Sequence, residues 1–476
     1  MIPLSLAQIA EITGATLDRV ADPGAVVAGP VVIDSRRPAP GGLFAAFAGE
    51  RADGHDFAAA AVAGGAVAVL GTRAAGVPAL IVPDVPAALA RLARAVVDRL
   101  PRVTIAGITG SSGKTTTKDL TAQLIARLGP TIAPEGSYNN EIGHPLTVLR
   151  ADERTRYMVL ELSARGAGHI RWLCEIAPPR LGAVLNVGRA HAGKFGGLEA
   201  VAKAKGELAE ALPPDGVAVL NADDPRVAAM AARTAARVVT FGQAEGADVR
   251  AAGLRLDELG RAAFTLVTPA GSAPVRLRLH GGHNAANALA AAALAWQLGM
   301  GTAAIADGLS GAVARSRWRM EVTQRPDGVT VVNDAYNANP DSVKAAIEAL
   351  AVIARGRRAI AVLGHMAELG EESAARHEEA GALAARAGVT RLIVVGQDAA
   401  PMLAGASSER GWRGDLLHVP DGDAALAELR SLLAPGDVVL VKASRAAGLE
   451  SVALGVLTET DQAGSDTAVA NDGVTQ

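Results

Sequence analysis

The sequence predicts an α/β protein of three domains: a small mixed α/β domain, a central domain on a parallel sheet, and a Rossmann-like C-terminal domain. Its 476 residues suffice for roughly three domains of about 150 residues each. Short strands fill the first hundred residues, and apolar strands then alternate with helices in two blocks, as in parallel sheets covered on both faces. We expect domains at residues 1–102, 103–314 and 315–460, followed by a disordered polar tail at 461–476.

Composition and charge exclude several classes of function. The net charge of −3 argues against a polyanion-binding surface over the whole protein, and an aromatic content of 3% leaves no ladder of rings for single-stranded nucleic acid. A single cysteine, Cys174, excludes an internal disulfide framework and fits a reducing compartment. The sequence shows neither the basic start of a secretion signal nor an apolar run of membrane-spanning length. We therefore expect a cytoplasmic protein.

The first domain is predicted from short apolar runs separated by turn residues, which indicate a small mixed sheet. Strands are expected at Val31–Asp34, Leu43–Phe47, Ala66–Leu70 and Ala79–Val82, and helices at Phe57–Ala63 and Pro86–Leu100.

Fully apolar strands alternate with helices from Val103 onward, which predicts a parallel sheet with helices on both faces. The expected strands are Thr104–Ile108, Tyr157–Leu162, Leu181–Val187, Val217–Leu220 and Val238–Phe241, with helices from Lys114, at Leu198–Leu212 and at Asn284–Leu298. Residues 248–280 alternate polar and apolar positions, which predicts antiparallel strands beside that sheet.

The last block repeats the alternation from Arg315 and predicts a smaller nucleotide-binding-type fold. Strands are expected at Val329–Asn333, Ala359–Leu363, Leu392–Val395 and Val438–Val441, and helices at Ser342–Ala354, Glu371–Ala387 and Ala424–Leu433.

The strongest chemical signal is the run GITGSSGKTTT, which begins at Gly107 between a predicted strand and a predicted helix. Backbone N–H groups of such a turn can face phosphates, Lys114 can neutralise their charge, and the Thr115 hydroxyl can meet Mg²⁺. The usual pattern places its first glycine one residue closer, but Gly110 and Gly113 still supply the tight turn. An ordinary glycine-rich connection is the alternative. We expect a P-loop ATPase domain.

Two further side chains follow predicted parallel strands. Glu161 ends the strand YMVLEL, and His191 follows the strand LGAVLNVG. The carboxyl ends of parallel strands form the edge at which open α/β sheets hold ligands, so both side chains are expected beside the phosphate loop. Glu161 offers the oxygen donors that Mg²⁺ prefers, whereas histidine is a less natural Mg²⁺ ligand. A capping or loop role is the alternative for each residue.

Lys205 occupies an unusual place in the predicted helix 198–212. The apolar residues Val201 and Leu208 recur at helical spacing, and Lys205 lies on the same stripe. A protonated amine that faces a core is costly unless it reaches water or loses its charge. Reaching water is the ordinary outcome. Alternatively, a neutral amine could react with CO₂ to give a carbamate anion that joins Glu161 near Mg²⁺.

Polar residues near the last domain junction admit two interpretations. Asn284 and Asn287 open a predicted helix and could read an adenine edge, or Asn284 could cap the helix. Asp334 follows an apolar strand, and Asn337 and Asn339 come shortly after it. These residues could bind a ligand or could form turns before the next helix.

Together, these segments resemble the Mur ligase family over essentially the whole chain except the tail. The motifs that carry the resemblance are DSR from Asp34 with GERADGHDF from Gly49, GITGSSGKTTT, NNEIGHPLT from Asn139, NVGRAH from Asn186 with AKGE from Ala204, GHNAAN and DAYNANPDS. Within the family, the NNEIG and YNANP segments favour the ligase that adds a D-alanyl-D-alanine dipeptide over the preceding ligase of the pathway.

The resemblance implies an ATP-dependent ligase that joins D-alanyl-D-alanine to UDP-N-acetylmuramoyl-tripeptide in peptidoglycan precursor synthesis. The tripeptide carboxylate attacks the γ-phosphate of ATP to form an acyl phosphate, and the dipeptide amine then displaces phosphate. Mg²⁺ and Lys114 offset the repulsion between the two anions. We also expect a monomer that does not bind nucleic acid and is not embedded in a membrane.

The matching motifs also imply site residues. Those that cradle the phosphates are Gly110, Ser111, Ser112, Gly113, Lys114, Thr115 and Thr116. Those that serve two Mg²⁺ ions are Thr115 with Glu161, and His191 with carbamylated Lys205. Those that contact the rest of the nucleotide are Asn287, Arg319 and Asp334. Those that receive the UDP-sugar are Ser35, Arg36, Asp53 and His55, and those on the peptide side are Asn139, Asn140, Asn337 and Asn339. The resemblance makes Lys114, Lys205 and His191 catalytic.

Two positions depart from the family pattern. His365 stands where an acidic residue is common, so no charge-dependent role is assigned to it. Ser163 stands where glycine is frequent, which affects loop shape more than metal binding. Two other functions stay open: a related Mur ligase that adds a single amino acid, and a nucleotide-dependent switch that forms no bond.

Overall fold

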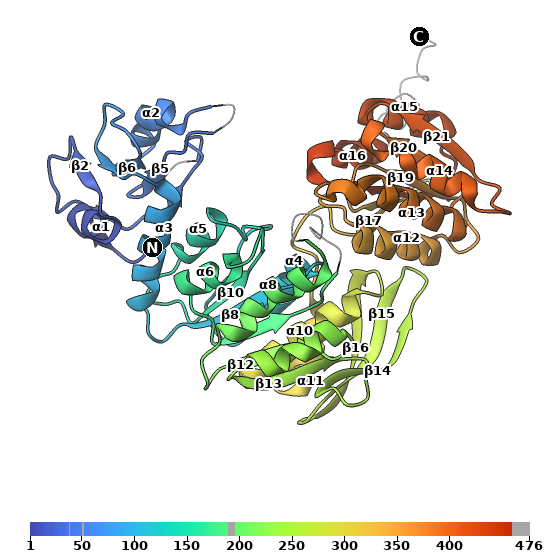
Figure 1. Cartoon of the computed structure of the whole chain (residues 1–476), viewed down its shortest axis with the longest axis horizontal. Helices are drawn as coiled ribbons and strands as arrows, with labels where there is room; N and C mark the ends of the chain where they lie inside the picture. The colour runs from blue at the N-terminus through green and yellow to red at the C-terminus, as the bar shows by residue number, and fades with distance from the viewer. Residues whose placement is uncertain (38, 50–51, 189–195, 459–476) are drawn as a thin grey trace, which may run out of the picture.

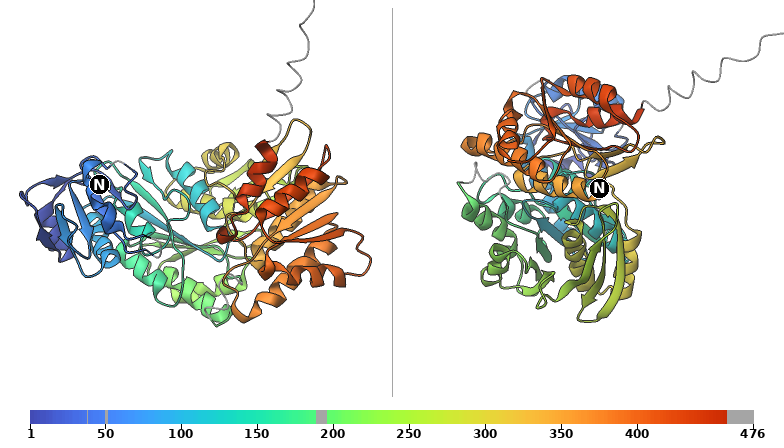
Figure 2. Two further views of the ribbon diagram at one scale, coloured as in Figure 1. Left: turned by 90° about the horizontal axis from the view of Figure 1, so that it is seen from above. Right: turned by 90° about the vertical axis from the view of Figure 1, so that its right-hand side faces the viewer.

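Three domains follow one another along the chain, and each contains its own sheet (Figure 1). The computed structural model describes residues 1–37, 39–49, 52–188 and 196–458. The central domain lies between the other two, which stand at opposite ends when the molecule is seen from above (Figure 2). No helix in these ranges is long and apolar enough to cross a membrane. The α/β class expected from the sequence is confirmed, and the expected tail lies outside the described residues.

The N-terminal domain is a small mixed sheet with the strand order β2-β7-β6-β5-β4, in which only the β2–β7 pair is antiparallel. Its elements are β1 (Leu4–Ser5), α1 (Leu6–Thr13), β2 (Thr16–Asp18), β3 (Val26–Val27), β4 (Val31–Val32), β5 (Leu43–Ala45), η1 (Gly54–Phe57), α2 (Ala58–Ala63), β6 (Ala68–Gly71), β7 (Ala79–Ile81) and α3 (Val85–Asp98). Helix α1 is absent from the sequence-based prediction. It begins at a capping box in which Ser5 and Gln8 exchange side-chain-to-backbone hydrogen bonds.

The central domain, within the described residues, carries a nine-stranded sheet ordered β16-β15-β14-β13-β12-β11-β8-β10-β9. Its elements are β8 (Thr104–Thr109), α4 (Lys114–Ile125), β9 (Thr131–Ile132), α5 (Gly143–Val148), β10 (Tyr157–Glu161), α6 (His169–Ile176), β11 (Leu181–Val184), α8 (Leu198–Glu210), β12 (Val217–Asn221), α9 (Pro225–Ala228), η2 (Ala229–Arg233), β13 (Arg237–Gly242), β14 (Val249–Leu256), β15 (Arg261–Thr268), β16 (Gly271–His280), α10 (Asn284–Gln297) and α11 (Thr302–Gly311).

The antiparallel strands of this domain are part of the main sheet. Strands β14, β15 and β16 pair antiparallel as expected, but β14 also pairs in parallel with β13. The expectation that these strands lie beside the sheet is therefore wrong. The edge of β13 offers free backbone N–H and C=O groups, and β14 pairs with them and extends the sheet.

Helix α10 accounts for the most apolar stretch of the chain. Residues 288–295 have no exposed surface, and the helix packs on α4 and on strands β12, β13 and β14. A helix that is apolar all round is a core helix, and its many alanines let neighbouring backbones approach closely. This packing fixes α4, which begins directly after the phosphate loop.

The C-terminal domain carries, in the described part of the chain, a six-stranded sheet ordered β17-β18-β22-β19-β20-β21, parallel except for the β17–β18 pair. Its elements are β17 (Glu321–Gln324), β18 (Thr330–Asn333), α12 (Pro340–Ala354), β19 (Ala359–Leu363), η3 (Gly370–Glu372), α13 (Ser373–Arg386), β20 (Arg391–Val395), η4 (Gln397–Ala399), α14 (Pro401–Ser408), β21 (Asp415–Val419), α15 (Gly422–Leu432), β22 (Val438–Lys442), η5 (Arg445–Ala447) and α16 (Glu450–Thr458).

The two edge strands of this sheet are not among the predicted elements. Most side chains of β17 and β21 are exposed or half-buried, whereas those of β18, β19 and β22 are buried. An edge strand lacks the continuous apolar run of an inner strand, which is the signal on which the prediction depends.

Candidate active site

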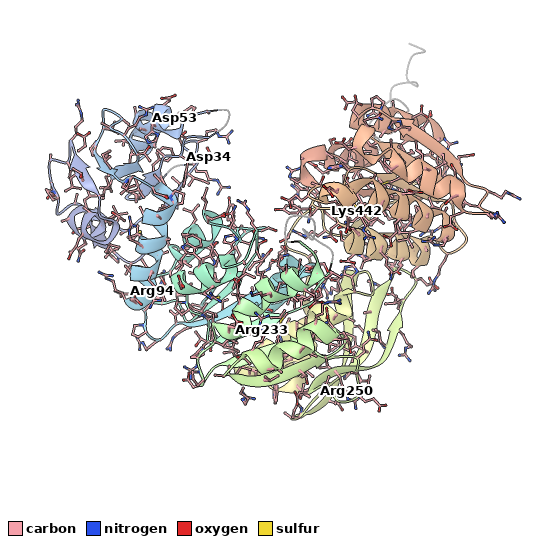
Figure 3. The ribbon with its side chains drawn as sticks, in the orientation of Figure 1. Asp34, Asp53, Arg94, Arg233, Arg250 and Lys442 are labelled. Atoms are coloured by element: carbon pink, nitrogen blue, oxygen red, sulfur yellow. The ribbon has the colours of Figure 1, made fainter. Side chains whose placement is uncertain are left out.

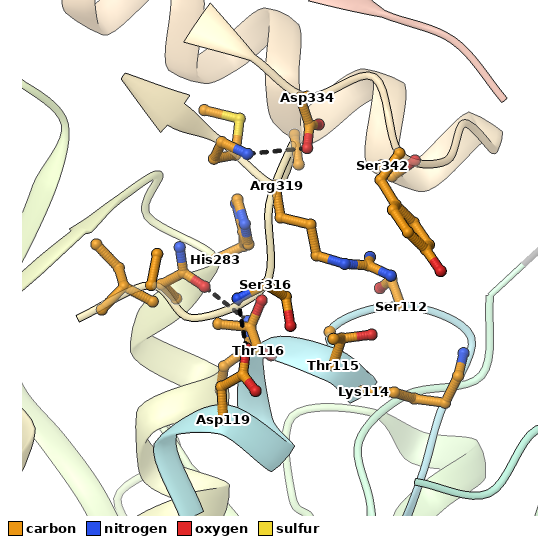
Figure 4. A pocket seen from close by; sticks show the side chains of 18 of the residues that line it. Ser112, Lys114, Thr115, Thr116, Asp119, His283, Ser316, Arg319, Asp334 and Ser342 are labelled. Atoms are coloured by element: carbon orange, nitrogen blue, oxygen red, sulfur yellow. Dashed lines mark hydrogen bonds between the residues drawn. The ribbon is translucent and has the colours of Figure 1, made fainter. Parts of the chain in front are cut away.

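A pocket of about 730 Å³ lies between the central and C-terminal domains. The central domain contributes the phosphate loop and the start of α10, and the C-terminal domain contributes segments around Arg319 and Asp334 (Figure 4). Lys442 of the C-terminal domain also lines the pocket. A pocket of this volume is in the range that holds a small-molecule ligand such as a nucleotide.

The phosphate loop joins β8 to α4, as the sequence predicts. Gly113 has a φ of +78°, and a Cβ there would lie 2.2 Å from Asn287 Oδ1, so a larger residue does not fit. The backbone N–H groups of Ser111 and Ser112 both donate to Asn186 Oδ1 at 2.9 Å. Asn186 follows β11 and orders the loop. Its role could not be predicted from the NVGRAH motif, because nothing in the local sequence links Asn186 to the loop.

Lys114 is half-buried at the start of α4, and its Nζ donates to the Gly110 carbonyl oxygen at 2.8 Å. Burial lowers the pKa of Lys114, the charge of Glu161 opposes this shift, and the charge of Arg319 adds to it. Three separate segments of the chain thus bring these charges within interaction range. The expectation that Glu161 stands beside the phosphate loop is consistent with this electrostatic coupling.

Glu161 ends β10 with its carboxylate buried beside β8. Oε1 accepts from Asn139 Nδ2 at 2.6 Å, while Oε2 has no hydrogen-bond partner among the described residues. Thr115 Oγ1 lies 3.0 Å from Ser137 Oγ, and both hydroxyls line the same pocket as Glu161. A buried carboxylate oxygen without a partner, in a pocket that is also lined by hydroxyls, fits a hard cation such as Mg²⁺. The described chain gathers no group of three or more His, Cys, Asp or Glu side chains for a metal.

Lys205 is buried in α8, on the stripe between Val201 and Leu208 that the sequence indicates. Burial lowers its pKa well below the ordinary value, and the charge of Lys114 lowers it further. The residue as a whole is only 5% exposed, so most of its side chain is packed within the domain. His191, the expected neighbour of Lys205, lies outside the described residues.

Arg319 reaches the central domain from the linker that precedes β17. Its Nη2 donates to Ser137 Oγ at 2.8 Å, and its guanidinium lies 4.2 Å from the centroid of the Tyr336 ring. Asp334 accepts from Lys442 Nζ at 2.5 Å and from the Met320 backbone N–H at 3.0 Å.

Lys442 is a buried residue that is not among the predicted site residues. Its ammonium also donates to the Asn337 carbonyl oxygen at 2.9 Å, so it holds both ends of the short turn after β18. Lys442 ends an apolar strand, as many lysines do, so the sequence gives no signal for its role.

The asparagines of α10 lie behind the phosphate loop. Helix α10 begins at Asn284 after His283 and has no side-chain cap, so the capping alternative for Asn284 is wrong. Its Nδ2 donates instead to the His280 carbonyl oxygen at 2.7 Å, which leaves Oδ1 to accept from Asn287 Nδ2 at 2.8 Å. Both asparagines line the pocket.

The four asparagines expected on the peptide side have different surroundings. Asn139 holds Glu161, and Asn337 lines the pocket. Asn140 Oδ1 accepts from two backbone N–H groups at the start of α5, and Asn339 caps α12 while it also lines the pocket.

The residues expected at the UDP-sugar lie on the N-terminal domain, away from the pocket. Figure 3 shows Asp34 and Asp53 on that domain and Lys442 on the C-terminal domain. Arg36 pairs with Asp34 at 2.8 Å beside Ser35. His55 is buried, its Nδ1 lies 2.5 Å from Asp53 Oδ1, and its Nε2 accepts from the Thr72 N–H at 2.9 Å. These contacts order the loop in which His55 and Asp53 stand.

Comparison with known proteins finds three family models that match successive segments of the chain. Residues 30–106 match the family model described as "Mur ligase family, catalytic domain", residues 108–295 match "Mur ligase middle domain", and residues 318–445 match "Mur ligase, glutamate ligase domain". The chain belongs to the Mur ligase family.

Curated Mur ligases align with nearly the whole chain. The UDP-N-acetylmuramoyl-tripeptide–D-alanyl-D-alanine ligase of Mycobacterium tuberculosis H37Rv is 51% identical, over 95% of this chain and 97% of that protein. The ligase of the same name from Escherichia coli K12 is 39% identical, over 95% of this chain and 98% of that protein.

Solved Mur ligase structures share the fold. A crystal structure of MurF from Acinetobacter baumannii has a TM-score of 0.85 at 31% identity and covers 96% of this chain and 99% of that chain. The MurF ligase of Thermotoga maritima in complex with ADP has a TM-score of 0.77 at 30% identity and covers 92% of this chain and 99% of that chain.

Proposed function

We propose that this Mur ligase joins D-alanyl-D-alanine to the terminal carboxylate of UDP-N-acetylmuramoyl-tripeptide at the expense of ATP. Curated relatives at 51% and 39% identity are named for that activity. The observation that carries the proposal is the interdomain pocket, whose lining combines the phosphate loop with Glu161 and Arg319. The product is a UDP-linked pentapeptide, a precursor of peptidoglycan.

The nucleotide binds with its phosphates on the loop from Gly110 to Thr116. Backbone N–H groups at the start of α4 suit phosphate oxygens, which favour the positive end of a helix. Lys114 exchanges the Gly110 carbonyl for a phosphate oxygen and gains a charged partner in place of a neutral one. Ser111, Ser112, Gly113 and Thr115 complete the cradle, and Asn287, Arg319 and Asp334 serve the remainder of the nucleotide.

Mg²⁺ is held by Thr115 and Glu161 in this proposal. The unpartnered Oε2 of Glu161 supports this assignment, because a buried carboxylate oxygen requires a cation or a donor. Bound Mg²⁺ supplies charge neutralisation for the phosphates. Asn139 keeps the carboxylate oriented through Oε1. A second Mg²⁺ is assigned to His191 and a carbamylated Lys205.

The reaction needs a better leaving group than a carboxylate offers. The terminal carboxylate of the tripeptide attacks the γ-phosphorus, the bond to the β-phosphate oxygen breaks, and ADP leaves. The amine of the dipeptide then attacks the acyl carbonyl, the amide bond forms, and inorganic phosphate departs with loss of the amine proton to solvent. Lys114 and Arg319 stabilise the charge on the transferred phosphoryl group.

The carbamate of Lys205 forms when its neutral amine bonds to the carbon of CO₂ and releases one proton. Burial on an apolar stripe supports this step, because a neutral amine is the form that a core favours. The carbamate then returns an anion to this edge of the sheet, where it would be a hard oxygen donor for a cation.

The substrates are proposed to span the three domains. Residues 1–102 hold the UDP-sugar through Ser35, Arg36, Asp53 and His55, residues 103–314 hold ATP, and residues 315–460 close over both. The peptide then extends toward the phosphate loop past Asn139, Asn140, Asn337 and Asn339. We propose a monomer that works in the cytoplasm, where ATP is available.

Phosphate release from ATP tests the function. We expect rapid release only when both UDP-N-acetylmuramoyl-tripeptide and D-alanyl-D-alanine are present, with a UDP-pentapeptide as product. Release that is indifferent to both substrates would indicate a nucleotide-dependent switch. Faster ligation of a single amino acid than of the dipeptide would indicate a related ligase.

The Lys114→Ala variant tests whether the phosphate loop serves ATP turnover. We expect this variant to lose ATP turnover and to keep its circular dichroism spectrum, because the lysine lies in a loop-to-helix connection and its ammonium donates to a loop carbonyl, which is not part of the core. Unfolding of the variant would mean that the loop is a structural element instead.

A further inference from the structure

Helix α4 holds the linker between the central and C-terminal domains, which we define as residues 312–319. Asp119 Oδ2 accepts from the Ser316 backbone N–H at 3.1 Å. The Gln123 side chain accepts from the Val313 N–H at 3.1 Å and donates to the Val313 carbonyl oxygen at 3.0 Å. Three hydrogen bonds thus attach the linker to the helix that begins at the phosphate loop.

Asp119 is itself held in place by a buried lysine. Its Oδ1 accepts from Lys118 Nζ at 2.5 Å, and the same ammonium donates to the Pro134 carbonyl oxygen at 2.8 Å. Lys118 is 1% exposed and Asp119 is 7% exposed. A buried ion pair with its remaining hydrogen bonds satisfied is costly to rearrange, so both the linker and the loop before Ser137 are tied to one rigid point.

The linker backbone is strained where it presents Arg319. Trp318 and Met320, the residues on either side of Arg319, have φ values of +60° and +50°. Residues with a Cβ adopt this left-handed conformation only where their surroundings determine it. The result is that Arg319 Nη2 reaches Ser137 Oγ, which in turn contacts Thr115 Oγ1 of the phosphate loop.

We propose that Asp119 is a positioning residue that fixes the linker at Ser316, so that Arg319 stands over the phosphate loop during phosphoryl transfer. Asp119 lines the pocket, as Figure 4 shows, but both of its carboxylate oxygens are already engaged with Lys118 and Ser316. It therefore acts through the linker and not on the nucleotide. This inference rests on the proposed role of Arg319.

A double-mutant cycle with Asp119→Ala and Arg319→Ala tests the proposal. Asp119→Ala is expected to lower kcat on the order of 10- to 100-fold, the cost of misplacing one group by about 1 Å. Its affinity for ADP is expected to stay nearly unchanged, because the phosphate loop is intact. In the Arg319→Ala background, the same substitution is expected to cause no further loss, since a residue that acts through Arg319 has nothing left to position.

Asp307→Ala is the matched control. It also removes an aspartate that pairs with a basic side chain, Arg127 at 2.8 Å, but Asp307 lies on α11 before the linker and Arg127 follows the end of α4, so this exposed pair does not hold the linker. We expect its kcat to equal that of the unmodified protein.

Asp119→Ala removes the carboxylate that pairs with the buried Lys118, and this variant could fail to fold. A second variant keeps the test decisive in that case. Gln123→Ala removes the other attachment of the linker from a half-buried site. It is expected to lower kcat, with no further loss in the Arg319→Ala background. Full kcat in a folded Asp119→Ala or Gln123→Ala variant, or losses that multiply with that of Arg319→Ala, would overturn the proposal. Full kcat in Arg319→Ala would instead overturn the function proposed for that arginine.

Discussion

Lys205 is an amine whose charge depends on what surrounds it. It is buried in α8, and the described residues offer it no acidic partner, so its neutral form is favoured. Lys205→Ala is expected to abolish ligation, because the carbamate anion cannot form without the amine. Added short carboxylic acids such as acetate are expected to restore part of the rate by filling the vacated space with an anion. Product formation measured against acetate concentration checks this expectation.

Direct detection of the carbamate distinguishes a catalytic role of Lys205 from a role in packing alone. Protein equilibrated with ¹³C-bicarbonate is expected to show one carbamate carbon signal by NMR, which disappears in Lys205→Ala and persists in Lys203→Ala, an exposed lysine on the same helix. Full activity of Lys205→Ala would exclude the carbamate.

His144 predicts a pH dependence of stability. It is buried in α5, and burial lowers its pKa from 6.5 to about 4. The unfolded chain therefore binds a proton more readily than the folded protein between these values, so the free energy of unfolding falls as the pH decreases from about 6.5 to 4. The loss from this residue is at most about 3 kcal/mol. Denaturant unfolding across this range should show a shallower pH dependence in His144→Leu, and an equal dependence in both proteins would contradict the prediction.

At the scale of secondary-structure elements, α12 shows how one side chain can serve two roles. Asn339 Oδ1 accepts from the Ser342 N–H at 2.9 Å, and Ser342 Oγ accepts from the Asn339 N–H at 3.0 Å. This capping box satisfies backbone donors that the first turn leaves free. The turn-forming interpretation of Asn339 is confirmed, and its role toward the peptide substrate stays a proposal.

Asn339→Ala and Asn339→Asp separate these roles. The alanine variant is expected to lose about 1 kcal/mol of unfolding free energy, because the cap is removed. The aspartate variant keeps the acceptor oxygen and is expected to keep its stability, while its KM for the tripeptide rises because a carboxylate cannot donate a hydrogen bond. Denaturant unfolding and initial rates measure both effects. Unchanged stability of Asn339→Ala would contradict the capping role.

At the scale of the whole molecule, the pocket is lined by the central and C-terminal domains, while the residues proposed for the UDP-sugar lie on the N-terminal domain. ADP alone is therefore expected to slow amide hydrogen exchange in the phosphate loop and in the turn 334–339, and to leave residues 53–72 unchanged. UDP-N-acetylmuramoyl-tripeptide is expected to protect residues 34–36 and 53–55. Exchange measured by mass spectrometry checks both, and protection of 53–72 by ADP alone would contradict this division.

The inner strands and the phosphate loop could be predicted because their signals are local. A buried parallel strand is a continuous apolar run, and β8 with α4 frames a glycine-rich turn whose spacing is visible in the chain. Lys205 could be singled out for the same reason, since helical periodicity places it on an apolar stripe. Edge strands β17 and β21 could not, because half-exposed side chains follow no such pattern.

The sequence by itself determined the three α/β domains, the phosphate loop and the carboxylate at the end of β10. Only the tertiary structure decided which distant residues complete the site. Asn186 reaches Ser111 across 75 positions, Arg319 reaches Ser137 across 182, and Ser316 reaches Asp119 across 197. Such contacts arise from the order in which strands assemble into a sheet and from the path of the linker. No periodicity of side chains encodes them, because periodicity reports only what a residue faces within its own helix or strand.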